Sequence, residues 1–215
     1  MNRTDTKTSK LARRTGIAAA LATVAMMVAP AAGLASTPVK FGAKLNPTVQ
    51  PSNSLPGLTC DGTQTVGPAC TMIQNEAYGR PEGGELAPKT GTIKKIRLIA
   101  GGPGSFNLQI AKVNRSTVHK SNQAKVTYTG PKISYTGQTE ANYEDDSYKV
   151  ESFAVNAPVK KGEQLALRGN ITSMIRCSSG GDNTLLYTPP LLTGNPFKPA
   201  SSTDGCWILM EAIYK

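Results

Sequence analysis

Short runs in which apolar and polar residues alternate dominate the chain after about residue 60. Phe106, Leu108 and Ile110, for example, alternate with polar positions, as in a strand with one buried and one solvated face. Strands are predicted over residues 71–78, 92–99, 105–114, 123–129, 148–155, 164–168, 170–177, 184–188 and 206–214. No run after residue 35 has a helical period. The pattern predicts an all-β fold, an antiparallel β-sandwich of jelly-roll type with about eight or nine strands.

A Gly/Pro turn at residues 101–104 separates two of these predicted strands, 92–99 and 105–114. A short turn between two alternating runs is typical of a β-hairpin, so we expect the two strands to pair. A phosphate-binding loop is the alternative, but no Gly-Lys-Ser/Thr sequence follows the glycines and no helix begins after them.

The last predicted strand, 206–214, is apolar on both faces. Trp207, Leu209 and Ile213 fall on one face, and the even-numbered residues from 208 to 214 fall on the other. Since a sandwich strand normally buries one face, we expect the second to be covered. The cover would be the proline-rich arm that follows the N-terminal segment, the 178–205 segment, or a partner.

Glu211 is the one charged residue inside this apolar strand. We expect it on the exposed face, or else desolvated inside the fold. A desolvated carboxyl is the setting of a catalytic acid, which makes Glu211 the carboxylate to consider for catalysis. Paired carboxylates of this kind suffice for glycoside cleavage.

The first 35 residues predict an export signal. Five basic residues precede an apolar run over 17–29, and small residues lead to Ala35. The run is too short for a membrane span, which is the alternative. We expect cleavage after Ala35 and export by Sec or Tat, because Arg13-Arg14 leaves both routes open. The mature protein would be secreted or associated with the cell envelope, with no membrane span.

Two further parts follow the signal. Residues 36–59 are rich in proline and predict an arm or linker without regular structure. Residues 60–215 are long enough for one β-sandwich domain with its own core.

The net charge changes which partners are expected. The whole chain has a net charge of +10, from 24 basic and 14 acidic residues. Without residues 1–35, which hold five basic residues and one acidic residue, 19 basic and 13 acidic residues leave +6. The lysines are scattered and form no arginine-rich block, so we do not expect nucleic acid as a partner. A moderately basic exported protein is suited to anionic polymers of the cell envelope.

The cysteines predict two disulfides. Four cysteines in an exported protein are typical of disulfides, and three connectivities are open. We expect the sequential one, Cys60–Cys70 and Cys177–Cys206, with each bridge contributing roughly 3–4 kcal/mol. A zinc site is not expected, because no Cys-x-x-Cys occurs and His119 is the one histidine.

Catalysis by a serine or cysteine triad is not expected. His119 lies in a polar stretch that predicts a loop, and no Gly-x-Ser-x-Gly occurs. The acidic residues Glu144, Asp145 and Asp146 are the candidates for a calcium site. Their spacing matches no calcium loop, and adjacent side chains in an extended segment point opposite ways. We therefore expect a solvated acidic loop and no cofactor.

Binding residues are expected in two places. Tyr143 and Tyr148 flank the acidic loop, and exposed rings beside polar groups can stack on sugars. The 178–205 segment contains apolar residues among prolines and glycines, including Tyr187, Leu191, Leu192 and Phe197. Long loops tend to be functional, and apolar groups need a surface to cover, so we expect this segment to bind a partner or to cover a sheet.

Several of the predicted strands together resemble a protein family. They are Cys70-Thr-Met-Ile-Gln, Gly91-Thr-Ile-Lys-Lys-Ile-Arg-Leu, Phe106-Asn-Leu-Gln-Ile, Val159-Lys-Lys-Gly-Glu-Gln-Leu-Ala-Leu and the apolar final strand. In this order they resemble the small exported β-sandwich proteins common in high-GC Gram-positive-type bacteria, over residues 60–214. Most of those proteins lack an assigned activity, so the resemblance implies the fold and export, and no catalytic residue.

Three functions remain open at this point. The first is a non-catalytic exported protein that binds a cell-envelope or extracellular polymer or protein. The others are a glycan-active hydrolase or lyase on a jelly-roll scaffold, and a structural module that associates with its own copies.

Overall fold

The computed structural model describes residues 38–51, 69–115, 122–169, 175–177 and 181–214, which belong to one compact unit, Thr37–Lys215. The predicted signal, Cys60 and His119 lie outside the described residues. No helix in the described part is long and apolar enough to cross a membrane.

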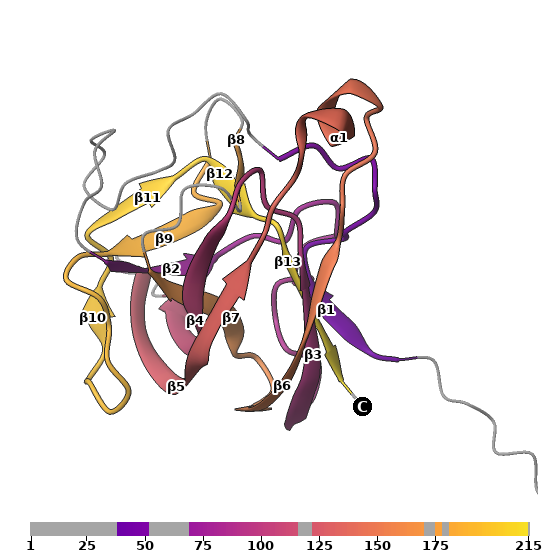
Figure 1. Cartoon of the computed structure of the whole chain (residues 1–215). Helices are drawn as coiled ribbons and strands as arrows, with labels where there is room; N and C mark the ends of the chain where they lie inside the picture. The colour runs from indigo at the N-terminus through magenta and orange to yellow at the C-terminus, as the bar shows by residue number, and fades with distance from the viewer. Residues whose placement is uncertain (1–37, 52–68, 116–121, 170–174, 178–180, 215) are drawn as a thin grey trace, which may run out of the picture. The chain divides into compact units, whose positions relative to one another are not determined.

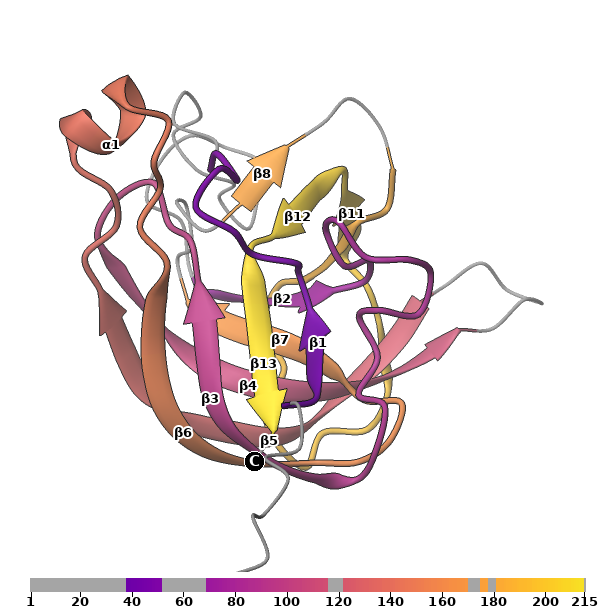
Figure 2. The same cartoon turned by 90° about the vertical axis from the view of Figure 1, so that its right-hand side faces the viewer.

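Two antiparallel sheets form the fold (Figures 1 and 2). The first has the order β1 (Lys40–Gly42), β13 (Met210–Tyr214), β3 (Gly91–Leu98), β6 (Glu151–Val159). The second has the order β10 (Lys198–Pro199), β5 (Asn122–Tyr135), β4 (Gly104–Arg115), β7 (Gln164–Gly169), β2 (Cys70–Gln74), β9 (Thr184–Tyr187), β11 (Ser202–Asp204). Outside these sheets lie the pair β12 (Cys206–Ile208) and β8 (Ile175–Cys177), and the short helix α1 (Glu140–Glu144).

Eight of these strands are arranged as a jelly roll, which confirms the predicted fold class. β1, β13, β3 and β6 form one layer, and β2, β7, β4 and β5 lie in the other. Along the chain these strands alternate between the layers except at β4 and β5, which pair with each other. The other five strands of the described chain have two to four residues each and extend this framework.

The predicted hairpin at residues 101–104 is wrong. β3 pairs with β13 and β6, whereas β4 pairs with β5 and β7, so residues 99–103 carry the chain from one sheet to the other. A Gly/Pro turn between two alternating runs has the same local pattern in a hairpin and in a crossover. Only the partners of the two strands distinguish the cases.

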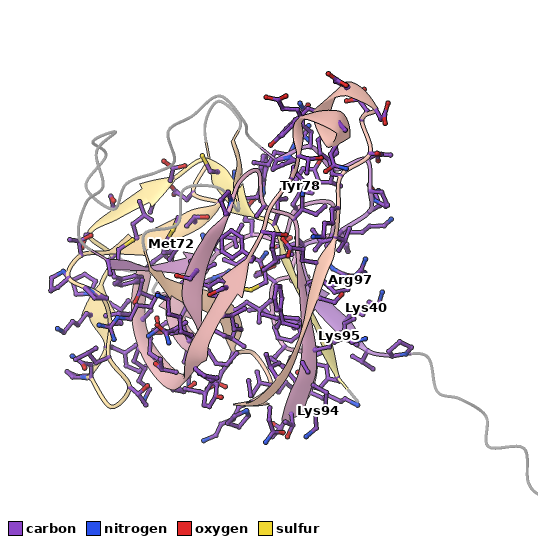
Figure 3. The ribbon with its side chains drawn as sticks, in the orientation of Figure 1. Lys40, Met72, Tyr78, Lys94, Lys95 and Arg97 are labelled. Carbon is purple, nitrogen blue, oxygen red and sulfur yellow. The ribbon has the colours of Figure 1, made fainter. Side chains whose placement is uncertain are left out.

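The main core lies between the two sheets. Ile93, Ile96 and Leu98 of β3 pack with Phe106, Leu108 and Ile110 of β4 in one buried cluster. Met72, which Figure 3 labels, belongs to the same cluster. Alternate residues of these strands point inward, and each fully buried side chain contributes about 1.5–3 kcal/mol relative to an exposed one.

The outer face of the seven-stranded sheet is partly covered, as the sequence suggested. On the seven-stranded sheet, Leu191 packs over a buried cluster that includes Ile73, Ala166, Leu185 and Tyr187. Leu191 therefore covers a sheet, whereas β9, β10 and β11 of the same 181–205 stretch are strands of that sheet. Burial on both faces explains why every residue of β2 is buried.

The proline-rich arm packs over Leu209, just before the terminal strand β13, and leaves Ile213 on the outer face of β13 partly exposed. Ala43, Leu45 and Val49 pack with Leu209 in a third buried cluster, and the N–H of Ala43 donates to the Met210 carbonyl at 2.8 Å. The prediction of an arm without regular structure is wrong for Lys40–Gly42, because this segment forms β1 on β13. The terminal stretch 206–214 is itself divided into β12 and β13, which lie in different sheets.

Neither Cys70 nor Cys206 is a free thiol. The register of β8 and β12 places Cys177 opposite Cys206. Facing residues of an antiparallel pair have Cα atoms about 4.5–5.5 Å apart, within reach of a disulfide. Cys60 and the Cys177 side chain lie outside the described atoms, so the sequential pairing stays a prediction.

Candidate anion-binding surface

The outer face of the four-stranded sheet is basic. Lys40 of β1 and Lys95 of β3 lie in one row across the strands, with Ile213 of β13 between them. In a neighbouring row, Glu211 of β13 lies between Gly42 and Arg97. We call Lys40, Lys94, Lys95 and Arg97 the basic face, and Figure 3 shows their side chains along the outer side of this sheet.

A β-bulge adds one cation to this face. Against β13, β3 advances two residues from Ile93 to Lys95 while β13 advances one, so Lys94 is the extra residue in that pair. Against β6 the register also shifts here, but the extra residue is on β6. Lys94 and Lys95 are consecutive and both exposed, which regular alternation would not allow. Lys94 Nζ donates to the Asn156 side chain on the exposed side of β6. The bulge therefore turns two consecutive lysines outward.

Glu211 lies buried beneath three cations, with 2 % of its surface exposed. Its Oε1 accepts from Arg97 Nη1 at 2.8 Å and lies 3.7 Å from Lys40 Nζ, and its Oε2 accepts from Arg80 Nη2 at 2.9 Å. Arg80 comes from the loop after β2, and its Nε donates to the Gly42 carbonyl. We call this group the Glu211 cluster.

The prediction that Glu211 is exposed is wrong. Its side chain is buried, as the alternative prediction of a desolvated carboxyl expected. It points to the outer face, as alternation predicts, but the stems of Arg80, Arg97 and Lys40 cover it. Both of its oxygens accept from guanidinium groups, so Glu211 acts as a counter-ion. A buried carboxylate is tolerated only when it is paired and hydrogen-bonded in this way.

The charges on this surface do not balance. Among the residues that the structure describes, the basic face and Arg80 supply five cations, and the carboxylate paired with them is that of Glu211. Glu151 also lies in the sheet, but its oxygens accept from the backbone N–H groups of Thr136 and Gly137, away from this face. The partly exposed side chains of Lys40, Arg80 and Arg97 (37%, 21% and 23%) keep donors available to a ligand. This surface can therefore bind anionic groups.

The predicted binding residues do not form one site. Tyr148 is buried in the cluster beneath the arm, and Tyr187 and Leu191 are buried in the cluster on the seven-stranded sheet, so their side chains cannot stack on a ligand. Tyr143 is half-buried and its hydroxyl donates to the Gly101 carbonyl at 3.2 Å. Leu192 is 49% exposed.

Phe197 is half-buried, with Lys125 Nζ 4.9 Å from its ring centroid. It therefore already has a cation on its ring, which is a cation–π contact within the chain. The residue belongs to the segment that covers the seven-stranded sheet and not to the basic face.

The calcium candidates lie at and after the end of α1. Glu144, Asp145 and Asp146 are exposed, and Asp146 Oδ1 accepts from the Tyr148 hydroxyl at 3.1 Å. In the described part of the chain, no three acidic, histidine or cysteine side chains are gathered closely enough to hold a metal ion.

The sequence analysis missed Lys40 and Arg80, and it treated Lys94, Lys95 and Arg97 as scattered charges. One feature of the sequence could have indicated the basic face: Lys94, Lys95 and Arg97 are three basic residues within four positions of one predicted strand. Nothing local links them to Lys40 or Arg80, because these residues approach only through the pairing of β1 with β13 and through the loop after β2.

Tyr187 allows a prediction about alkaline stability. Burial raises the pKa of Tyr187 above its ordinary value of 10, and its hydroxyl donates to the Asn122 carbonyl at 3.1 Å. The unfolded chain therefore ionises first, so this stabilisation is present below about pH 10 and is lost as the pH rises, by up to about 1.4 kcal/mol per pH unit.

Urea unfolding from pH 9 to 11 tests this. We expect Tyr187→Phe to reduce the loss of stability with pH, but not to abolish it, because burial also raises the pKa of Tyr214. The same loss in the variant and in the natural chain would contradict the assignment to Tyr187.

Comparison of the chain with protein-family models, with curated proteins and with solved structures found no match.

Proposed function

We propose that this protein is an exported, non-catalytic β-sandwich protein that binds an anionic polymer of the cell envelope or the extracellular space through its basic face. The observation that supports this is the excess of cations over carboxylates on the outer face of the four-stranded sheet. Export is inferred from the pattern of residues 1–35, and the resemblance to small exported β-sandwich proteins agrees with it.

The arrangement of the cations favours a polymer over a small anion. Lys40 and Lys95 lie on strands separated by β13, so their backbones are about 10 Å apart. Lys95 and Arg97 are two residues apart on β3, which separates them by about 7 Å. Cations spread over an exposed sheet face can contact successive charges of one chain, and many such weak contacts add up to useful affinity.

Charge-removing substitutions test this function. We expect replacement of Lys40, Lys94 and Lys95 by Gln to weaken binding to polyphosphate or polygalacturonate about tenfold. Each exposed ion pair contributes about 0.2–1 kcal/mol, and about 1.4 kcal/mol is tenfold in affinity. Titration calorimetry on residues 36–215 measures the affinity.

The matched control replaces Lys112, Lys132 and Lys198 by Gln. These exposed lysines lie on β4, β5 and β10 of the other sheet, so the change in net charge is the same. We expect this variant to bind as the natural chain does. Equal weakening in both variants, or equal binding of neutral dextran, would show that the basic face is not the site.

A further inference from the structure

A pocket of about 390 Å³ lies beside the Glu211 cluster. Its lining comes from the segment after β2 and from the last residue of β4, and includes Asn75, Glu76, Arg80, Glu82, Glu85 and Arg115. This volume falls within the range of small-molecule sites in proteins, at its lower end. It can take a group of the size of an amino acid side chain or one sugar ring.

Two successive turns shape the pocket. The N–H of Gly84 donates to the Pro81 carbonyl at 3.0 Å, and the N–H of Leu86 donates to the Gly83 carbonyl at 3.1 Å. The Gly84 carbonyl accepts from the N–H of Gly42 at 2.8 Å, which ties the loop to β1. A Cβ at Gly84 would come 2.5 Å from the Cβ of Arg80. The loop is therefore packed in place.

A buried carboxylate lines this pocket. Glu85 is 4 % exposed, and its Oε1 accepts from Arg115 Nη2 at 2.9 Å. Arg115 Nη2 also donates a hydrogen bond to the Asn75 carbonyl at 2.8 Å. Among the described residues, the hydrogen bond to the Glu85 carboxylate is made to Oε1 and none reaches Oε2, and the fully buried side-chain oxygens that lack a partner are those of Gln74 and Gln164. One oxygen of a buried carboxylate is therefore left for a ligand.

The remaining charges favour a cation in the pocket. Glu76 and Glu82 are exposed and also line it. Arg80 directs its Nη2 and Nε to Glu211 and to the Gly42 carbonyl, so Arg115 is the cation that offsets the three carboxylates. These carboxylates are not gathered as a metal site requires. An ammonium group needs fewer oxygens, because it has three donors.

We propose that this pocket binds a primary ammonium group of a ligand, with Glu85 Oε2 and a carboxylate at the rim accepting its N–H bonds. The ammonium group belongs either to an alkylamine, as in a lysine side chain, or to an amino sugar. This inference stands independently of the polymer-binding function. The pocket adjoins the basic face through Arg80, so one ligand with both anionic and ammonium groups could contact both.

Nuclear magnetic resonance on residues 36–215 tests the proposal. The probes are cadaverine and glucosamine, and their neutral counterparts are 1,5-pentanediol and N-acetylglucosamine. We expect one of the amines to shift the amide signals of residues 75–85 and Arg115, and its neutral counterpart to bind at least about tenfold more weakly, since a hydrogen bond to a charged group contributes about 1.5–3 kcal/mol. Whichever amine binds identifies the source of the ammonium group.

Charge-removing variants localise the effect. We expect Glu85→Gln and Glu82→Gln to weaken amine binding, and the exposed Glu144→Gln on α1 to leave it unchanged as the control. Glu82 is exposed, so we expect Glu82→Gln to fold. This variant can therefore still test the proposal if Glu85→Gln does not fold. The proposal is overturned if neither amine shifts these signals, if the neutral counterparts bind as tightly, or if binding survives in Glu82→Gln and in any folded Glu85→Gln.

Discussion

Replacing Gly42 by alanine is expected to lower the free energy of unfolding by at least about 3 kcal/mol. Gly42 has φ +87°, where an L residue costs roughly 1–2 kcal/mol. An added Cβ would also lie 2.6 Å from the Met210 carbonyl oxygen, 2.8 Å from Leu165 Cδ1 and 3.0 Å from Gln74 Oε1. Because a backbone atom is the nearest neighbour, β1 would have to move off β13, and overpacking costs about 1–3 kcal/mol more.

Gly83→Ala separates the two contributions. Gly83 has φ +82°, but a Cβ there would meet nothing within 4 Å. We expect this variant to lose only the conformational part, roughly 1–2 kcal/mol. Urea unfolding of both variants gives the difference, and equal losses would refute the steric explanation for Gly42.

Replacing Glu211 by alanine is expected to cost about 3 kcal/mol. The change leaves the guanidinium groups of Arg80 and Arg97 without their acceptor and brings three unneutralised cations together. Removing one partner of a buried ion pair typically costs about 3–5 kcal/mol, and we take the lower end because the cations are partly exposed. Thermal and urea unfolding measure the loss.

Glu140→Ala is the control for Glu211→Ala. Glu140 is exposed in the first turn of α1, so its removal should stay within about 0.5 kcal/mol. If Glu211→Ala lost no more than this control, the cluster would not stabilise the fold. The large losses of stability expected for Gly42→Ala and Glu211→Ala both arise where β1 and the loop after β2 contact β13.

The basic face and the junction of β1 with β13 are parts of one arrangement. The pairing of Gly42 with Glu211 brings Lys40 to the sheet, and the Glu211 carboxylate then orients Arg80 and Arg97. The proposed binding of a polymer on this sheet face would be favoured by cations that are held in place, because flexible side chains lose conformational entropy on binding. The buried carboxylate supplies this order.

The sequence by itself determined the fold class and the faces of the strands. Alternation identified Phe106, Leu108 and Ile110 as inward residues, and all three are buried between the sheets. It also placed the even-numbered residues from 208 to 214 together on one face of the terminal stretch, and all four are buried. These features follow from the two-residue period of a strand, which is a local property of the chain.

The tertiary structure decided which segments lie next to each other. Strands β3 and β4 follow one another along the chain yet lie in different sheets, and Leu191 is buried because it packs on Ile73 and Ala166 of distant strands. Glu211 is buried because Lys40, Arg80 and Arg97, from three separate segments, converge on it. Periodicity specifies the face on which a residue lies, but its neighbour across that face depends on strand pairing between segments far apart in the sequence.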